Sequence, residues 1–337
     1  LMSLVRRLKL GKLREEQFDA LLERGDLSDI LTLQARGWGH DEEPLERFLA
    51  SDAFEELEEL TYARDKTRTS TEDARRVART FGASTSFPNL HRLTLHGWKM
   101  MTSGARLLRV GGSLSRLGAL GLIDADLSAQ GIAELLEPGS WPSLTHLELR
   151  GNAVGNEGLA HIARWGGDGR LSHLGLQRSV IGADAAGLFA REPAFSGLIS
   201  LDVTENTWLR PGIAQLARAP FIRNLISLRV GQGVLDDSSL ERLLAGSNLA
   251  HLEHLSMPWS DVTDRAIHAL TGSSMRSLRA LDLNQNWQIT HEGIERLANA
   301  PLAMSLDELR ICGVKLGIAG TDSLVDGRFL TSLRRLA

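Results

Sequence analysis

Two histidines and a carboxylate are the first candidates for chemistry in this sequence. His146 and His173 hold the same place in two similar stretches, LTHLEL and LSHLGL, and Glu148 follows the first histidine by two positions. Two imidazoles and one carboxylate can hold a transition metal. The same side chains are also ordinary polar residues of an exposed strand, where a histidine can make a pH-sensitive contact. We favour the interpretation that these are ordinary polar residues of a strand, so we predict no metal site and no cofactor.

Sequence motifs of catalysis and nucleotide binding are missing from the chain. It contains no G-x-x-x-x-G-K-[ST], G-x-G-x-x-G, G-x-S-x-G, H-E-x-x-H or C-x-x-C motif. His291 and Glu292 begin a zinc-protease-like motif, but no second histidine follows at the helical spacing. The single cysteine, Cys312, has no base assigned to it by the pattern and is expected to be inert. We therefore predict that the protein is not an enzyme.

Composition and charge exclude several other classes of protein. The chain is 42% hydrophobic and 24% charged, which is typical of a globular protein. A net charge of −4 argues against nucleic-acid binding, which normally needs a basic surface. No stretch approaches the roughly 18 apolar residues of a membrane span, and the N-terminus lacks the apolar core of a signal peptide. Since a single cysteine fits a reducing compartment, we predict a cytoplasmic protein without membrane contact.

A leucine pattern with a nearly constant period organises most of the chain. The pattern L-x-x-L-x-L, with Val, Ile or Met allowed, recurs nine times, and its starting positions are evenly spaced. The copies begin at Leu90, Leu117, Leu144, Leu171, Leu198, Leu225, Leu252, Leu278 and Leu306. Two further copies are expected to open at Leu57 and at Leu330, and the last of these stops mid-unit at Ala337. The unfinished unit predicts either a fragment of a longer chain or a partner that covers this end.

Each unit is predicted to contain one strand, one loop and one helix. Apolar and polar residues alternate in the leucine pattern, as in Leu147-Glu148-Leu149, which is strand patterning. A helical pattern follows in most units, and residues such as Ser128 or Thr290 can cap it. One unit is too small to bury its own apolar face, so neighbouring units must stack and share a core. Strands pack about 4.8 Å apart and helices about 8–10 Å apart, which bends the stack with its strands inside.

These repeats resemble the leucine-rich-repeat family, and the 27-residue unit with a full helix is similar to its ribonuclease-inhibitor-like subclass. The resemblance covers residues 57–337 and implies an α/β solenoid, a horseshoe with a parallel sheet on the concave side and helices on the convex side. In the family, an asparagine at the ninth position of the unit satisfies backbone groups of the loop. Asn152, Asn206 and Asn286 occupy that position here, and other residues replace it elsewhere.

The N-terminal segment is expected to differ from the repeats. We predict that residues 1–56 form a helical cap, with a degenerate repeat around Leu31 and Leu33 as the alternative. Residues 57–337 then form the repeats. The run LLERGDLSDILTLQ is similar to a short domain that precedes leucine-rich repeats in some bacterial proteins, which implies a bacterial origin.

The concave face is the predicted binding surface. Strand side chains alternate, so the third, fifth and seventh positions of each unit point away from the core. The partner contacts expected there are His146, Glu148, Arg150, His173, Gln177, Asp202, Arg229, His254, Asp282 and Arg310. Trp98 and Trp259 are expected on the rim, where a tryptophan either anchors a partner or packs against its loop. Trp141 and Trp208 occupy apolar positions and are predicted to be structural.

A curved repeat array predicts an interaction protein. Solenoids offer extended concave surfaces, so we predict a non-enzymatic scaffold that binds a protein partner of unknown identity on its concave face or rim. Two alternatives stay open: a regulator of GTPases, by analogy of fold alone, and the target-recognition subunit of a larger sensor or enzyme complex. The acidic run between Asp41 and Glu59 is predicted to be a solvated helix face, or else a docking edge.

Overall fold

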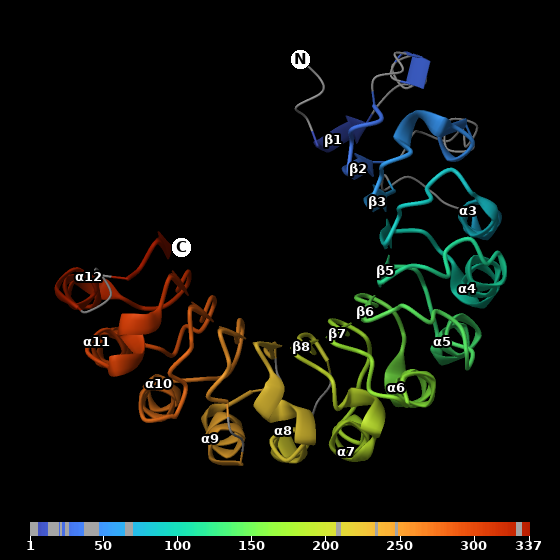
Figure 1. Ribbon diagram of the computed structural model, residues 1–337. Coiled ribbons are helices and arrows are strands. Elements are labelled where there is room, and N and C mark those ends of the chain that lie inside the picture. Colours follow the sequence, from blue (N-terminus) through green and yellow to red (C-terminus); the bar gives the residue numbers. More distant parts are fainter. Residues whose placement is uncertain are drawn as a thin grey trace. The chain divides into compact units, whose positions relative to one another are not determined.

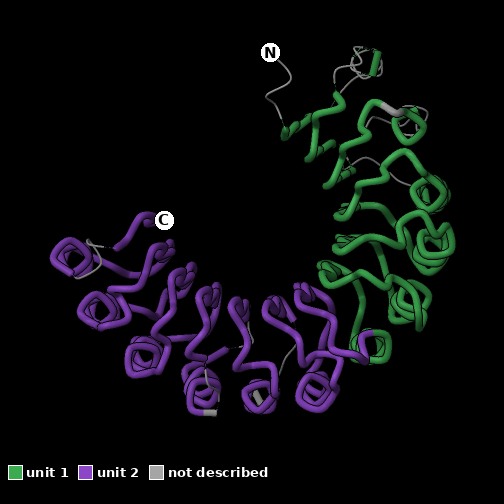
Figure 2. Tube along the Cα trace, in the orientation of Figure 1, with its two compact units in different colours: residues 1–165 green, residues 166–337 purple. Residues whose placement is uncertain are grey.

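The computed structural model divides the chain into two compact units, residues 1–165 and 166–337 (Figure 2). The structure describes residues 6–12, 20, 22–23, 27–36, 47–64, 70–206, 210–232, 235–246, 249–327 and 332–337. Trp208, Leu330 and the acidic residues between Asp41 and Glu46 lie outside the described residues.

The first unit is a row of strand–helix repeats with a parallel sheet along one side (Figure 1). Its strands are β1 (Arg7–Lys12), β2 (Thr32–Arg36), β3 (Glu59–Ala63), β4 (Arg92–His96), β5 (Ala119–Ile123) and β6 (His146–Glu148). Its described helices are the 3-10 turn η2 (Asp52–Phe54), α3 (Thr71–Ala83), α4 (Met101–Val110), α5 (Ala129–Leu135) and α6 (Gly155–Trp165). Each strand pairs in parallel with the next one along the chain, and α3 to α6 pack side by side.

The second unit repeats this arrangement. Its strands are β7 (His173–Gly175), β8 (Ser200–Asp202), β9 (Ser227–Arg229), β10 (His254–Ser256), β11 (Ala280–Asp282), β12 (Glu308–Arg310) and β13 (Arg335–Leu336). Its α-helices are α7 (Ala185–Arg191), α8 (Arg210–Leu216), α9 (Asp237–Gly246), α10 (Asp264–Thr271), α11 (His291–Ala298) and α12 (Gly317–Asp326). Short 3-10 helices precede three strands: η3 (Pro193–Phe195), η4 (Pro220–Asn224) and η5 (Pro301–Ser305). Within each unit the strands lie on the inner side of the curve and the helices on the outer side (Figure 1).

The predicted strand register is confirmed within each unit. Leu201 pairs with Leu228, and the same fourth-position leucines continue this row through Leu255, Leu281 and Leu309. These leucines are at most 1% exposed, because the apolar face of each strand packs against the helices. The polar alternates therefore face away from the core, as the alternation predicted.

The predicted helix caps are also confirmed. Ser128 accepts a hydrogen bond from the Gly131 N–H at the start of α5, and Thr290 accepts one from the Glu292 N–H at the start of α11. A side-chain oxygen at this position satisfies one of the backbone donors that a helix leaves free at its N-terminus. Trp141 is buried as expected, and its indole N–H donates to the carbonyl of Leu135.

The phase predicted for the last repeat is wrong by three residues. Arg335 pairs with Glu308 and Leu336 with Leu309, so Leu336 holds the fourth position of the pattern. The last unit therefore opens at Leu333 and not at Leu330, which restores the regular interval from the copy at Leu306.

The N-terminal segment contains two strands that continue the sheet of the first unit. Leu33 in β2 pairs with Leu60 in β3, and Leu8 in β1 pairs with Leu33. These leucines occupy the fourth position, which is the arrangement expected of degenerate repeats. Among its described residues, the segment predicted as a helical cap is therefore not all helical. The boundary after residue 56 stays a prediction.

No helix in the described ranges is both long enough and apolar enough to cross a membrane.

Candidate functional site

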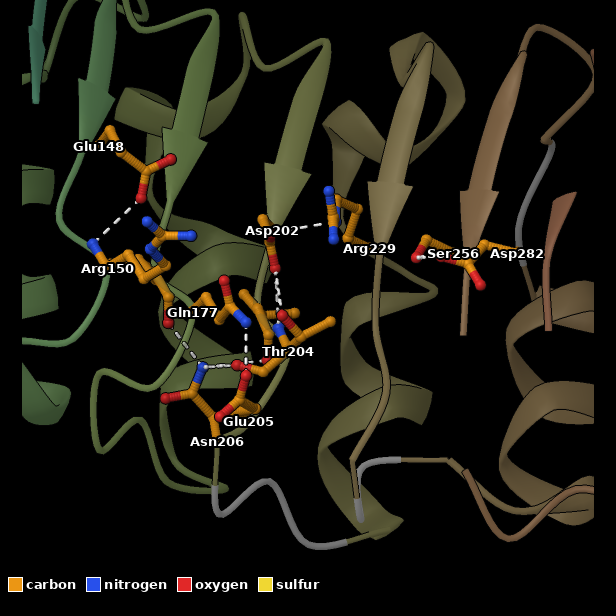
Figure 3. Close-up of polar contacts among 12 residues, drawn as sticks. Glu148, Arg150, Gln177, Asp202, Thr204, Glu205, Asn206, Arg229, Ser256 and Asp282 are labelled. Atoms are coloured by element: carbon orange, nitrogen blue, oxygen red, sulfur yellow. Dashed lines mark hydrogen bonds and ion pairs between the residues drawn. The ribbon is translucent and has the colours of Figure 1, made fainter. Parts of the chain in front are cut away.

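A row of charged and small side chains crosses the inner face of the second unit. Its members hold the fifth position of successive repeats, and we call it the central row: Asp202, Arg229, Ser256, Asp282 and Arg310. Parallel pairing places each member beside the next one, as the view of β8 to β11 shows (Figure 3). The row exists because the odd positions of each strand cannot turn into the apolar core.

Ion pairs link the charged members of the central row. Nε of Arg229 lies 3.1 Å from Oδ2 of Asp202, and NH1 of Arg310 lies 3.8 Å from Oδ2 of Asp282. Glu308, the first residue of β12 and the third position of its repeat, contacts Nε of Arg310 at 2.7 Å and NH1 of Arg335 at 3.4 Å. Opposite charges on neighbouring strands stabilise the sheet modestly when they stand side by side.

A pocket of about 220 Å³ lies in this face between β9 and β12. Ser227, Ser256 and Ala280 line the pocket at outward positions, and their short side chains leave its space open. Arg229 and Arg310 stand at its two ends, and His254 lines it as an exposed side chain. Pockets in rigid sheets with a few convergent polar groups are typical binding sites.

The structure brings together four of the predicted contact residues at this pocket, namely Arg229, His254, Asp282 and Arg310. Asp202 joins them through its ion pair with Arg229. Gln177 lies at the seventh position of the β7 repeat, where its amide donates to Glu205. The prediction missed Ser227, Ser256, Ala280 and Glu308 as pocket-lining residues. The sequence signal for the two serines and the alanine was a short side chain at an outward position, and Glu308 holds the outward third position of its repeat.

Three predicted contact residues, His146, Glu148 and Arg150, belong to the first unit. Nδ1 of His146 is 2.8 Å from the Thr145 hydroxyl, and Glu148 accepts from the backbone N–H of Arg150 at 3.0 Å. His173, on β7 of the second unit, makes a similar 2.9 Å contact with the hydroxyl of Ser172. The closeness of His146 to His173 stays a prediction. Within the described ranges, no three His, Cys, Asp or Glu side chains are grouped so that they could hold a metal ion.

Trp98 follows the packing alternative, and its place among the predicted partner contacts is corrected, because the side chain is buried in its loop and not exposed on the rim. The side chain is only 4% exposed and stacks on Tyr62 with 5.3 Å between ring centroids. The guanidinium of Arg64 lies 5.4 Å from the Trp98 ring and makes a cation–π contact. Trp98 therefore packs its own loop and is not accessible to a partner.

Trp259 does lie exposed on the rim, and it has an aromatic neighbour. Trp259 and Trp287 are 48% and 52% exposed, and their rings meet edge to face at 5.1 Å. The backbone of Trp259 is fixed because its N–H donates to Asn284 and its φ is +53°. Trp287 donates its indole N–H to Gln285. This aromatic pair follows β10 and β11, the two middle strands of the pocket.

The ninth-position asparagines bind the loop of the preceding repeat. Asn152 is buried, accepts from the N–H groups of Ala125 and Leu127 at 3.0 Å, and donates to the carbonyls of Leu122 and Leu149. Asn206 makes the equivalent four bonds in the second unit, and Asn286 makes three of them. The role that the resemblance implied for these asparagines is therefore confirmed.

Comparison with known proteins agrees with this repeat. A sequence profile described as "Leucine Rich repeat" matches residues 142–163 and 274–298, the repeats that contain Asn152 and Asn286. No curated protein matches the sequence. Among solved structures, the chain is similar to the yeast Rad7–Elc1 complex at a TM-score of 0.52, with 16% identity over 91% of this chain and 69% of that chain.

Two bacterial structures also align with the chain. An internalin of Listeria monocytogenes gives a TM-score of 0.46 at 16% identity, over 99% of this chain and 87% of that chain. A protein of Bacteroides fragilis gives 0.42 at 14% identity, over 80% and 70%. Together, the repeat pairing, the asparagine bonds and the profile match define the class of fold: the chain contains leucine-rich repeats and forms an α/β leucine-rich-repeat solenoid.

Proposed function

We propose that this protein is a non-enzymatic scaffold that binds a protein partner on the inner face of its second unit. The observation that carries the proposal is the pocket between β9 and β12, where a shallow floor of small residues is flanked by Arg229 and Arg310. Arginine is enriched where protein interfaces concentrate their binding energy, and a pocket between rigid strands needs no rearrangement to accept a side chain.

The exposed tryptophan pair extends this surface beyond the pocket. A stable interface covers roughly 800 Å² on each partner, which is far more than one pocket provides. Trp259 and Trp287 follow two of the strands that line the pocket, and their exposed rings offer apolar area beside the polar row. A partner that crosses β9 to β12 would contact both features.

Site-resolved cross-linking tests the proposal. A photoreactive amino acid replaces Ser256 in the pocket of the intact chain, and in a matched control it replaces Arg242, an exposed residue of the outer helix α9. Each variant is irradiated in an extract of the native source. We expect a discrete adduct from the Ser256 variant alone. An adduct of equal yield from position 242, or from that position only, would contradict the proposal.

Substitutions then measure the contribution of each contact to binding of the cross-linked partner. Arg229→Glu and Trp259→Ala should both weaken binding while the melting temperature stays nearly constant, because both side chains are half-exposed. The charge reversal should lose part of its effect at high salt, since screening acts over about 8–10 Å. The tryptophan effect should persist. Arg150→Glu tests whether the partner also reaches the first unit.

Three further proposals concern the repeat subclass, the cellular compartment and the source of the protein. We propose the ribonuclease-inhibitor-like subclass because the spacing between successive strands leaves room for a full helix, as in α4, α6 and α11. The single cysteine, Cys312, is exposed and supports a reducing, cytoplasmic setting. A bacterial source is proposed from the N-terminal run alone, and the identity of the gene neighbours would test it.

A further inference from the structure

Charge on the inner face of the second unit is arranged in two layers. The arginines are the outer layer, because the side chains of Arg229 and Arg310 are 48% and 42% exposed. The carboxylates lie beneath them, with Asp202 at 19%, Asp282 at 14% and Glu308 at 21% exposure. A partner that approaches this face therefore meets guanidinium groups before it meets carboxylates.

The hydrogen bonds strengthen this asymmetry. One oxygen of Asp202 accepts from both the N–H and the hydroxyl of Thr204, and the other faces Arg229. Asp282 accepts from the Ser256 hydroxyl at 3.1 Å and from the Asn284 N–H at 3.0 Å. The acceptor sites of these carboxylates are thus largely occupied by the protein itself, which leaves little for a basic ligand.

The arginines keep donors for a ligand. A guanidinium carries five N–H donors in a planar fork. The contact between Arg229 and Asp202 uses Nε, so the terminal N–H groups of Arg229 remain at the pocket. Arg229 and Arg310 sit at equivalent positions three strands apart, about 14 Å between their Cα atoms at the usual strand spacing. Arg310 already directs Nε to Glu308 and NH1 toward Asp282, so only its remaining terminal N–H groups can face a ligand between the two arginines.

We infer that the partner of this face presents an acidic segment, and that one of its Asp or Glu side chains enters the pocket between Arg229 and Arg310. The inference rests on the proposed function and specifies the chemistry of its partner. A carboxylate matches the fork of an arginine in geometry and charge, and His254 adds a further polar group to the pocket wall. Because Ser227, Ser256 and Ala280 have short side chains, the pocket has space for the Asp or Glu side chain of the partner.

A nucleic acid is a weaker match to the same arginines. Binding to a phosphate backbone draws on a continuous basic surface, whereas every arginine here stands beside a carboxylate. The chain as a whole carries a net charge of −4, which repels a polyanion at long range. A short acidic peptide segment avoids most of this repulsion.

Fluorescence anisotropy with labelled peptides tests the inference on the intact chain. The probes are a short oligoglutamate, an oligoglutamine and an oligolysine of equal length, and a single-stranded oligonucleotide. We expect the oligoglutamate to bind, with an affinity that falls as salt is added, and the neutral and basic peptides to bind at least about tenfold more weakly. Equal binding of oligoglutamine, or tighter binding of oligolysine or of the oligonucleotide, would overturn the inference.

Three variants assign the binding to the pocket. Arg229→Gln and Arg310→Gln should each weaken oligoglutamate binding by roughly tenfold, because each removes a charge-assisted hydrogen bond. Ser256→Phe should also block it by filling the pocket without changing the charge. The control is Arg265→Gln, which removes an exposed arginine that pairs with Glu241 on the outer helices. If the control weakens binding as much as the pocket variants do, attraction is non-specific and the inference is wrong.

The two proposals can fail separately. If the Ser256 cross-linker captures a partner at a segment without acidic residues, and oligoglutamate does not compete with that partner, the acidic-segment inference falls and the scaffold function stands. If no adduct forms at position 256 but oligoglutamate binds through the two arginines, the inference about ligand chemistry stands and the scaffold function falls.

Discussion

Asp264 binds Thr290 with both of its carboxylate oxygens. Oδ1 accepts from the Thr290 N–H at 2.8 Å, and Oδ2 accepts from the Thr290 hydroxyl at 2.6 Å. Asp264 is the first residue of α10, and Thr290 caps the next helix, α11. The same pair of bonds joins Asp237 to Thr263 one repeat earlier. Each of these helices therefore holds the cap of the helix that follows it.

Removal of this carboxylate should loosen the start of α11. We expect Asp264→Ala to lower the free energy of unfolding by about 1–2 kcal/mol, because two hydrogen bonds to a charged acceptor are lost at a helix terminus. Chemical denaturation measures the change. In a double-mutant cycle with Thr290→Ala, the two effects should be strongly non-additive. Additive effects would show that the two residues act independently.

Gly293 has no room for a side chain. A Cβ at this position would lie 2.2 Å from Oδ1 of Asp264, so Gly293→Ala should displace the carboxylate and destabilise the protein by roughly 1–3 kcal/mol. Gly187, inside α7, is the matched control, since its added Cβ would first meet the flexible end of Gln215 at 3.5 Å. Gly187→Ala should be neutral or stabilise the protein by up to about 1 kcal/mol. Thermal melting of both variants makes the comparison, and similar losses would contradict it.

The buried asparagine in the β6 repeat should be costly to replace. Asn152→Ala removes the hydrogen bonds of this side chain to three carbonyls and leaves the N–H groups of Ala125 and Leu127 without their acceptor. We expect a loss of about 2–4 kcal/mol, because buried donors without partners carry the full cost of desolvation. Asn299→Ala is the control, since this exposed asparagine donates to a single carbonyl. Native-state hydrogen exchange should show faster exchange of the Ala125 and Leu127 amides in the Asn152 variant.

The two faces of β8 should respond differently to truncation. Leu201 is fully buried between stacked repeats, so Leu201→Ala should cost about 2–5 kcal/mol. Ser200, its neighbour on the same strand, faces outward, and Ser200→Ala should change stability by less than about 0.5 kcal/mol. Equal shifts in melting temperature would refute the strand register.

Acid should weaken one ion pair between the outer helices. Arg265 hydrogen-bonds Glu241 through two nitrogens and lowers the pKa of that carboxyl from its ordinary value of 4.5. A lowered pKa in the folded state gives a contribution to stability that is present above pH 4.5 and is lost as the pH falls through the lowered value. Arg265→Gln should raise the pKa of Glu241 in an NMR titration. An unchanged midpoint would show that the pair does not persist in solution.

The repeat could be predicted from the sequence because leucines at equivalent positions pair with one another in neighbouring strands. The fourth-position leucines such as Leu228 and Leu255 are buried in register, so their regular interval could be counted without a structure. The last unit, in contrast, was placed three residues too early. Leucines at positions 330, 333 and 336 are three residues apart, and the pattern fits them in more than one phase.

The burial of Trp98 could have been predicted from its position in the repeat. It occupies the same ninth position as Asn152, Asn206 and Asn286, and those asparagines must face inward to bind loop backbone groups. Any residue at this position is therefore directed into the loop, and Trp98 is buried accordingly.

The pocket was less accessible to prediction. Its arginines and aspartates could be placed on the inner face from spacing alone. The layering of arginines above carboxylates could not be predicted, because it depends on the rotamers of long side chains and on partners such as Thr204 and Asn284.

The direction of the asparagine bonds has a consequence for synthesis of the chain. Asn152 serves the loop at residues 122–127, and Asn206 serves the loop at residues 176–181, so each loop is completed by a residue that emerges from the ribosome about one repeat later. During translation the most recent of these loops has backbone groups without their partner until the next repeat is made. At these loops, order must therefore follow translation with a lag of about one repeat.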